Sequence, residues 1–404
     1  MDDIIYPDLS VIILGHVDHG KTTLAKSLTG KWLSKHSEEI KRGLTIKLGY
    51  ADFTIYKCNE HGYFTEKICP MCNKENKPIR KISIVDAPGH ESLLMVMLTG
   101  AAIVDAAIFV VAANEPVPQP QTLEHLVAFK YLGNKPLIIV QNKIDLVTKE
   151  EAMKNYREIL NLLDKLNINK NKVKIIPISA INNVNINYLL EELVNLPKLE
   201  KDENSDPIFL ISRSFDVNKP GTDIEKLVGG VLGGSLLKGT LKLNDEIEIR
   251  PGLFINNKWI PIKTKIVSLK QGNYGVEEIL PRGTAGIGTT LDPSVTKDDT
   301  LAGQIAGYVN KLPPQYDEIK VKYEVIKELF NENEKIQKGE TIIVGVYNII
   351  SDGIVKNIEK ENILTIKLNK PILGYKDDKV IILKNINKRW KIFAIGKLLW
   401  SIRY

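Results

Sequence analysis

The stretch Gly15-His16-Val17-Asp18-His19-Gly20-Lys21-Thr22 decides the fold of this chain. It has the spacing of a phosphate loop, and it lies between the apolar run 11–14 and the helix-like segment 23–28, as a nucleotide-binding loop must. In such a loop, backbone N–H groups and the following helix N-terminus point at a polyphosphate. Lys21 adds a positive charge and Thr22 offers a hydroxyl to Mg²⁺. The stretch therefore predicts a nucleotide site; the alternative is a glycine turn between a strand and a helix.

The composition is that of a soluble globular protein with more than one domain. A chain of 404 residues is too long for a single core and predicts roughly two to four domains. The longest apolar run, residues 101–113, is interrupted by Asp105 and falls short of the ~18 residues of a membrane span. The start Met1-Asp2-Asp3 lacks the basic region of a signal peptide. We therefore expect a cytoplasmic protein without a membrane partner.

Positive charge is concentrated near the C-terminus. The net charge of the whole chain is +6, whereas residues 355–404 alone hold 12 Lys and Arg against 4 Asp and Glu. This surplus fits a polyanion such as RNA, and it fits a solvated lysine-rich surface equally well.

Residues 1–200 alternate apolar runs with amphipathic segments. This rhythm predicts an α/β domain with a parallel-type sheet and helices on both faces, with ligands at the carboxyl ends of the strands. The expected strands are 10–14, 82–85, 106–111, 137–140 and 173–178, and the expected helices include 122–132, 149–166 and 186–196. We therefore expect the binding motifs to meet at one edge of this sheet.

The second half of the chain has a different pattern. A polar, proline-bounded linker spans 197–207, and short β-type runs separated by glycine turns follow it. A second break comes at Pro313-Pro314. These patterns predict two β-barrel domains, at 207–310 and 314–404.

The segment Asn142-Lys143-Ile144-Asp145 follows an expected strand and selects the base. A carboxylate accepts hydrogen bonds from both the ring N–H and the exocyclic amine of guanine, and adenine has no such pair of donors. Ser179 and Ala180 follow the last expected strand, where they can present backbone N–H groups to the guanine oxygen. The ligand is therefore predicted to be GTP or GDP. The alternative role for 142–145, an isolated helix cap, explains the order of the motifs less well.

Two more stretches are predicted to sense the γ-phosphate. In Asp86-Ala87-Pro88-Gly89-His90, Asp86 can hold Mg²⁺ through water and Gly89 can donate its backbone N–H. In Arg42-Gly43-Leu44-Thr45, Thr45 can reach the same ion and order its loop when GTP is bound. Either stretch could also be an ordinary turn.

The cysteines form a candidate zinc site. Cys58 and His61, followed by Cys69 and Cys72, provide four ligands in two turns, which suits tetrahedral zinc. Because no coordination position is left open, the role should be structural. The odd number of cysteines and the expected compartment argue against disulfides. The alternative is three reduced cysteines in a loop.

Together the motifs resemble those of the translational GTPases that carry tRNA. The resemblance is closest to the gamma-subunit family of archaeal and eukaryotic translation initiation factor 2, and it runs from about residue 10 to the C-terminus. Besides the cysteine knuckle, it rests on 112–116, 213–221 and 227–230. His61 departs from the four cysteines usual in the family, and Leu44 replaces a usual isoleucine.

The resemblance implies a slow GTPase switch that carries methionylated initiator tRNA to the small ribosomal subunit. It implies a heterotrimer, with an alpha subunit docked on domain II and a beta subunit on the GTP-binding domain. It also places the acceptor end of the tRNA near Tyr50, Arg282 and Gly283.

The resemblance further assigns roles within the nucleotide site. His90 would position the attacking water behind a gate of Val17 and Leu44, although this histidine could also be a plain cap. Mg²⁺ would be bound by Thr22, Thr45, Asp86 and Asp18. The expected nucleotide-binding set is Asp18, His19, Gly20, Lys21, Thr22, Thr23, Gly89, Asn142, Lys143, Asp145, Ser179 and Ala180.

Two alternatives stay open. A selenocysteine-specific or general elongation factor shares the GTPase motifs, but the cysteine knuckle is not expected in either. A GTP-bound scaffold subunit that does not hydrolyse its nucleotide is also conceivable, although Thr45, Asp86 and His90 argue against it.

Overall fold

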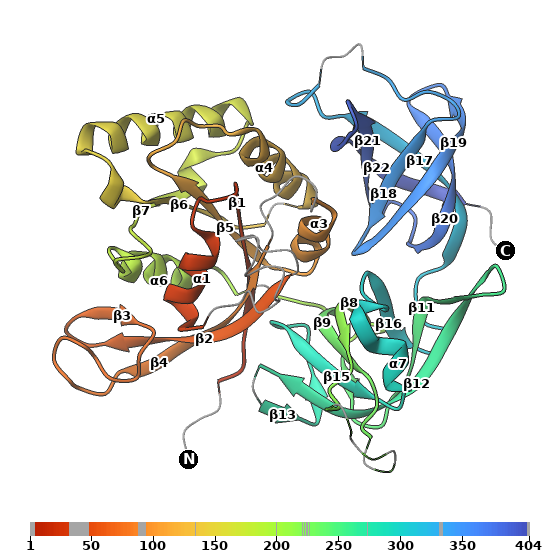
Figure 1. Ribbon diagram of the computed structural model, residues 1–404, viewed down its shortest axis with the longest axis horizontal. Coiled ribbons are helices and arrows are strands. Elements are labelled where there is room, and N and C mark those ends of the chain that lie inside the picture. The colour runs from red at the N-terminus through yellow and green to blue at the C-terminus, as the bar shows by residue number, and fades with distance from the viewer. Residues whose placement is uncertain are drawn as a thin grey trace. The chain divides into compact units, whose positions relative to one another are not determined.

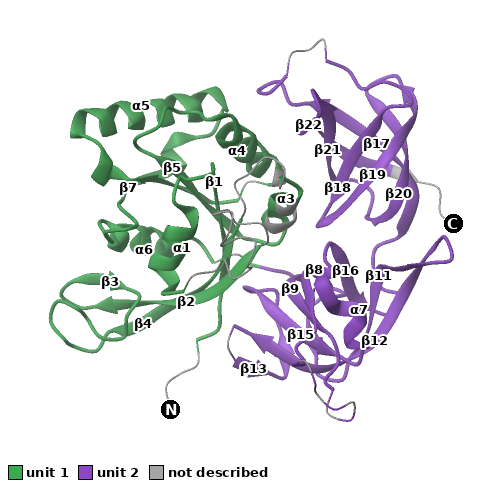
Figure 2. Ribbon diagram, viewed as in Figure 1, with its two compact units in different colours: residues 1–200 green, residues 201–404 purple. Residues whose placement is uncertain are grey.

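The structure is a computed structural model, which describes residues 5–31, 48–87, 94–133, 135–198, 200–219, 221, 223, 225, 227–272, 274–330 and 334–401. The chain forms two compact units, Met1–Glu200 and Lys201–Tyr404, which are described separately below (Figure 2). Within the described ranges, every helix is too short or too polar to span a bilayer.

The first unit is built on a seven-stranded sheet with the order β3-β2-β4-β1-β5-β6-β7 (Figure 1). Strands β4, β1, β5, β6 and β7 are parallel to one another, whereas β2 runs antiparallel to β4 and to β3. The strands are β1 (Leu9–Gly15), β2 (Gly49–Cys58), β3 (Gly62–Phe64), β4 (Lys77–Asp86), β5 (Ala106–Ala112), β6 (Leu137–Asn142) and β7 (Lys174–Pro177). The parallel part confirms the predicted sheet, and the β2–β3 hairpin extends it.

The helices of this unit follow the strands. They are α1 (Lys21–Thr29), α3 (Leu94–Ala102), α4 (Pro120–Leu132), α5 (Lys149–Lys165) and α6 (Ile186–Asn195). Helix α1 ends at Gly30, whose φ of 69° suits glycine. Helix α5 begins with a capping box in which Thr148 and Glu151 satisfy each other's backbone N–H groups.

The buried residues of β1 show that helices cover the first sheet. Alternate residues of β1, such as Val11 and Ile13, point to one face and pack with Leu24 of α1 and Leu189 of α6. The residues between them, such as Ile12, are equally buried, so β1 is covered on both faces. Burial on both faces gives β1 its continuous apolar sequence, which ends where the polar phosphate loop begins.

The second unit contains two β-barrels (Figure 1). In the first, strands β11-β16-β8-β9-β15-β12 form a ring that the β11–β12 pairing closes. In the second, β17-β20-β19-β18-β21-β22 form a closed barrel. All pairings in both are antiparallel. The predicted class, an α/β domain followed by two β-barrels, is confirmed.

The bounds of the second unit's elements are as follows. The first ring consists of β8 (Ile208–Phe215), β9 (Val231–Lys238), β11 (Glu246–Ile255), β12 (Lys258–Gln271), β15 (Ala285–Thr289) and β16 (Gln304–Tyr308). Beside it lie β10 (Leu241–Lys242), β13 (Tyr274–Val276), β14 (Glu278–Ile279) and the short helix α7 (Pro293–Thr296). The second barrel consists of β17 (Gln315–Val325), β18 (Thr341–Val346), β19 (Ile349–Glu359), β20 (Ile363–Leu373), β21 (Lys379–Ile386) and β22 (Arg389–Ser401).

Candidate functional site

The phosphate loop joins β1 to α1, and both of its glycines are required by close packing. Gly15 has a φ of 140°, and a Cβ at this position would lie 2.3 Å from the carbonyl oxygen of Val110. Gly20 has a φ of 89°, and a Cβ there would lie 2.3 Å from Nδ2 of Asn142. Both positions therefore exclude any larger residue, which accounts for the Gly spacing in the sequence.

Lys21 lies over this loop. Its Nζ donates a hydrogen bond to the carbonyl oxygen of His16 at 2.6 Å, and the residue is only 7% exposed. Burial lowers the pKa of Lys21 to about 8, against the opposing effect of the nearby carboxylates of Asp86 and Asp18. A polyphosphate is a suitable partner for such a cation, because it would replace the hydration that burial removes.

Two predicted Mg²⁺ ligands meet beside the loop. The Thr22 hydroxyl, in the first turn of α1, donates to Oδ2 of Asp86 at 2.8 Å. Asp86 is fully buried at the end of β4, which pairs with β1. A hydroxyl and a carboxylate are oxygen donors of the kind that Mg²⁺ prefers, so this pair fits the ion.

Asn142 connects the phosphate loop to the loop expected at the guanine oxygen. Its Nδ2 donates to the His19 carbonyl at 2.9 Å, and its Oδ1 accepts from the Ala180 N–H at 3.0 Å. Asn142 is 3% exposed, whereas the side chain of Asp145 lies at the surface, where a base can reach it. One side chain thus holds the two loops that were predicted to contact opposite ends of the nucleotide.

We expect Asn142→Ala to weaken GDP binding by about tenfold to a hundredfold, because it leaves a buried carbonyl and a buried N–H unpaired at a cost of about 1–3 kcal/mol. Asn142→Asp is the matched variant, since it keeps an acceptor for Ala180 but turns an oxygen toward the His19 carbonyl. Titration with GDP measures both. Equal affinity of parent and both variants would contradict this role.

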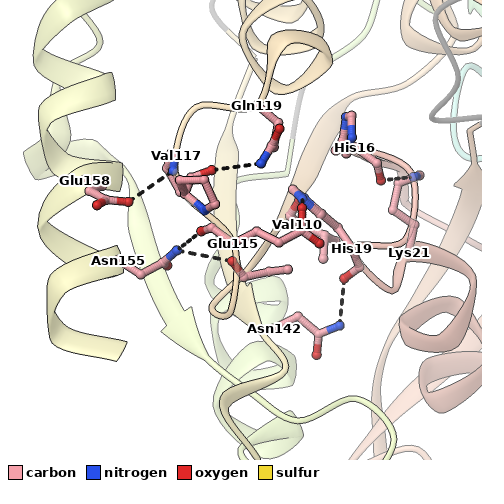
Figure 3. Close-up of polar contacts among 12 residues, drawn as sticks. His16, His19, Lys21, Val110, Glu115, Val117, Gln119, Asn142, Asn155 and Glu158 are labelled. Carbon is pink, nitrogen blue, oxygen red and sulfur yellow. Dashed lines mark hydrogen bonds and ion pairs between the residues drawn. The ribbon is translucent and has the colours of Figure 1, made fainter. Parts of the chain in front are cut away.

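The His19 side chain joins the loop to the segment after β5 (Figure 3). Its ring is 1% exposed, with Nδ1 at 3.1 Å from the Val110 carbonyl and Nε2 at 3.3 Å from a Glu115 carboxylate oxygen. Burial lowers the pKa of His19, while the Val110 carbonyl and the Glu115 carboxylate act in the opposite direction. The sequence predicted His19 as a nucleotide-binding residue, not as a link to the segment after β5. Glu115 entered only as part of the segment 112–116 that resembles the family.

Helix α5 in turn holds the segment that carries Glu115 (Figure 3). Asn155 donates from Nδ2 to the carbonyls of Ala112, at 3.2 Å, and Glu115, at 2.9 Å. The Glu158 carboxylate accepts from the Val117 N–H at 3.1 Å. Sequence reasoning missed these residues. The available signal was the position of Asn155, a polar residue on the otherwise apolar face of α5.

His125 of α4 is a second histidine near the loop that sequence reasoning missed. It is 1% exposed, and Nδ1 of its ring has no hydrogen-bond partner among the described residues. Burial, with smaller effects of Lys21 and His16, lowers the pKa of His125 to about 3, although the nearby backbone of Gly15 opposes this. The ring is therefore neutral in the folded protein.

This burial predicts acid sensitivity of the first unit. Between the ordinary pKa of 6.5 and about 3, the unfolded chain binds a proton at His125 that the folded chain excludes, so stability falls as pH falls. Between about pH 7 and about pH 5, we expect the free energy of unfolding of the first unit to fall by about 2 kcal/mol less in His125→Gln than in the parent. Hydrogen exchange of the β1 and β5 amides measures this difference, and identical losses in both proteins would contradict it.

Several predicted residues lie outside the described ranges. These are Arg42, Gly43, Leu44, Thr45, Gly89 and His90. Their roles at Mg²⁺, at the γ-phosphate and at the attacking water stay predictions. Val17, the other predicted gate residue, is partly exposed in the phosphate loop.

The four predicted zinc ligands come together next to the β2–β3 hairpin. Their ligand atoms all lie within 4.8 Å of one another. Cys58 Sγ is 3.6 Å from His61 Nδ1 and 3.7 Å from Cys72 Sγ, and Cys69 Sγ is 3.7 Å from the same His61 nitrogen. Ligands bound at ~2.3 Å to a tetrahedral zinc ion are separated by about 3.8 Å. The group could therefore hold zinc with little rearrangement.

The residues predicted to contact tRNA belong to different units. Tyr50 lies on β2 of the first unit, where it pairs with Val85. In the second unit, Arg282 forms an ion pair with Glu203, and the Gly283 carbonyl accepts from the Ser235 hydroxyl at 2.9 Å. That these residues share one binding surface stays a prediction.

Comparisons with known proteins cover both halves of the chain. Residues 7–198 match the model of the elongation factor Tu GTP-binding domain, and residues 317–398 match that of the C-terminal part of initiation factor eIF2 gamma. The fold is similar to that of a bacterial selenocysteine-specific elongation factor, with a TM-score of 0.73 and 24% identity over 98% of this chain and 58% of that one. It is also similar to elongation factor SelB from Methanococcus maripaludis, with a TM-score of 0.73 and 22% identity over 99% of this chain and 80% of that one. Identities this low show the fold alone.

Curated relatives are similar over nearly the whole length. Translation initiation factor 2 subunit gamma of Pyrococcus horikoshii is 45% identical over 400 residues, which cover 96% of this chain and 97% of the relative. The protein of the same name from Methanocaldococcus jannaschii is 43% identical over 402 residues, which cover 97% of each. This chain therefore belongs to the family of translation initiation factor 2 gamma subunits, and its first unit is a GTP-binding domain of the elongation factor Tu type.

Proposed function

We propose that this chain is a GTP-dependent carrier of methionylated initiator tRNA to the small ribosomal subunit. The observation that carries the nucleotide part is the side chain of Asn142, which joins the phosphate loop to Ala180. These two hydrogen bonds support the proposal because they link the loop expected at the phosphates to the loop expected at the base. The tRNA part rests on membership of the initiation factor family.

In this proposal, guanine is bound by Asp145 and the backbone at Ser179 and Ala180. The phosphates lie over the backbone N–H groups of the loop 18–23 and beside Lys21. Thr22, Thr45, Asp86 and Asp18 hold Mg²⁺, directly or through water. The ion, when bound, neutralises charge on the β- and γ-phosphates.

The proposed switch depends on residues that contact the γ-phosphate. Thr45 and the N–H of Gly89 move toward it with GTP, and His90 orients the attacking water behind Val17 and Leu44. Hydrolysis removes these contacts, and the form that binds tRNA is lost. A tenfold change in tRNA affinity needs ~1.4 kcal/mol of coupling between the two ligands, which two such contacts can supply.

The remaining partners follow from the same family membership. We propose that residues 207–310 and 314–404 are domains II and III, that an alpha subunit docks on domain II and a beta subunit on the GTP-binding domain, and that the complex acts in the cytoplasm. Tyr50, Arg282 and Gly283 are proposed contacts for the acceptor end of the tRNA.

A single-turnover assay of phosphate release from bound GTP separates this switch from a scaffold that keeps its nucleotide. We expect slow release that His90→Ala reduces further while GDP affinity is unchanged. Absence of release from the complete complex on the small ribosomal subunit would favour the scaffold. The similarity to selenocysteine-specific factors does not favour a role like theirs, because it shows only the shared fold.

A further inference from the structure

Glu115 is a partly buried acid beside the phosphate loop, and the predicted nucleotide-binding set does not include it. Its carboxylate lies 3.3 Å from Nε2 of His19, and its side chain is 29% exposed, whereas that of His19 is 1% exposed. Nδ1, on the other side of the same ring, is 3.1 Å from the Val110 carbonyl (Figure 3). The His19 ring is thus held at both of its nitrogens by groups that follow or belong to β5.

The backbone around His19 depends on such support. The His19 carbonyl accepts from Nδ2 of Asn142 at 2.9 Å. The residues on either side of His19 both have left-handed backbone, with a φ of 61° at Asp18 and 89° at Gly20. For a residue other than glycine this conformation is unfavourable, and it persists where the surrounding structure holds it. The anchored ring of His19, one position after Asp18, provides that hold.

The segment that carries Glu115 is itself fixed by helix α5. Asn155 donates from Nδ2 to the Glu115 carbonyl at 2.9 Å, and the Glu158 carboxylate accepts from the Val117 N–H at 3.1 Å (Figure 3). A side chain can hold another in place only when its own backbone is held. Glu115 meets this condition, so its carboxylate can fix the His19 ring rather than follow it.

The charge of Glu115 works against an anion at this loop. A carboxylate near the phosphate loop repels a polyphosphate by Coulomb's law. If Glu115 affected the nucleotide through its charge alone, removal of that charge would therefore strengthen binding. If Glu115 acts by holding His19, removal of the contact would weaken binding. The two explanations predict opposite signs for the same substitution.

We infer that Glu115 is a positioning residue of the nucleotide site. It holds the His19 ring, and through it the left-handed turn at 18–20, so that the N–H groups of Gly20 and Lys21 keep their direction toward the phosphates. The inference rests on the proposed placement of the nucleotide at this loop. It predicts that loss of the contact between Glu115 and His19 speeds the release of GDP and GTP alike.

Two substitutions of Glu115 test this role in the full-length chain. Glu115→Ala removes the contact. Glu115→Gln removes the charge but keeps the contact, because an amide can accept from Nε2 of His19 or donate to it, whichever ring nitrogen carries the proton. Dissociation of a fluorescent GDP analogue is measured with Mg²⁺ present. We expect release to be about tenfold faster with Ala and within about twofold of the parent with Gln.

Asn114→Ala is the matched control, since Asn114 is the exposed neighbour of Glu115 on the same segment. This variant should leave release unchanged. Slower release from both Glu115 variants would show that the carboxylate acts by its charge, and would overturn the inference. Equal acceleration by Glu115→Ala and Glu115→Gln, or by Asn114→Ala, would also overturn it, in favour of general loosening of the segment.

A double-mutant cycle tests whether Glu115 acts through His19. In a His19→Ala background the ring is gone, so the addition of Glu115→Ala should change GDP release by less than about twofold. A further tenfold acceleration in that background would overturn the inference, because Glu115 would then act by another route.

Lys21→Ala tests the placement of the nucleotide itself. If Lys21→Ala abolishes GDP binding and Glu115→Ala changes nothing, the role of Glu115 is wrong and the proposed site stands. If Lys21→Ala leaves GDP binding intact, the proposed site is wrong, and the inference is overturned with it.

Discussion

Asp145→Asn is expected to lower the affinity for GDP by about 10³-fold or more and to make xanthosine diphosphate the preferred ligand. In the proposed site, the carboxylate of Asp145 accepts from two N–H groups of guanine, whereas the new amide turns a donor toward a donor. Xanthine has a carbonyl in place of the exocyclic amine, and this carbonyl can accept from the amide. Competition titrations with both diphosphates measure the change.

The position of Asp145 makes this variant easy to interpret. The Asp145 side chain is exposed, and the turn that precedes it contains Lys143, which has a positive φ of 63°. The substitution should therefore leave the fold unchanged. Asp145→Ala is the control, because it should weaken GDP binding without making xanthosine diphosphate a tight ligand, since it has no amide to donate to the xanthine carbonyl. Unchanged preference for guanine in the Asn variant would contradict the assignment.

Removal of zinc is expected to have the largest effect on stability. Structural zinc sites contribute an apparent ~10–16 kcal/mol at neutral pH, because ligand binding and local folding occur together. We expect about one zinc ion per chain. Chelation or Cys69→Ser should remove it and abolish hydrogen-exchange protection between Cys58 and Lys77. Metal analysis and hydrogen exchange measure the two effects.

Met71→Ala is the matched control for the zinc site. Met71 lies in sequence between two of the ligands, is 71% exposed and is not one of the four predicted ligands. This variant should keep both its zinc and its exchange protection. Gently purified protein that contains no zinc, and that loses no protection on chelation, would contradict a structural metal site.

Much of the candidate site could be predicted from sequence because its chemistry is local. The phosphate loop, the motif 142–145 and the pair Ser179-Ala180 each follow a parallel strand, and parallel strands end at one edge of a sheet. The cysteine ligands are also local, since Cys58 and His61 share one hairpin and Cys69 and Cys72 share one turn. Each such motif carries its own spacing.

The residues that support the site could not be predicted, because they act over long distances in the sequence. Asn155 reaches Glu115 only because α5 lies at the ends of β5 and β6, where Asn155 also bonds to Ala112 and Gln141. His125 lies close enough to Lys21 for its pKa to be lowered only because α4 packs against β1. A polar residue on an apolar helix face signals a buried partner without identifying it. The β2–β3 hairpin was missed for a related reason, since its partly exposed strands lack a continuous apolar run.

The order of strands in the barrels was also beyond the sequence. Glycine turns and short apolar runs predicted barrels, but the pairing of β8 with both β9 and β16 joins segments far apart in the chain. Register depends on such long-range pairs, and a single chain offers no local signal for them.

The central claim is that GTP controls the binding of initiator tRNA. Its most direct test is a competition between initiator Met-tRNA and elongator Met-tRNA for the complex of this chain with the proposed alpha and beta subunits, in GTP and in GDP. The account predicts that initiator Met-tRNA is preferred, with an affinity at least about tenfold higher in GTP than in GDP. Equal binding of the two tRNAs, or equal binding of initiator Met-tRNA in GTP and GDP, would contradict it.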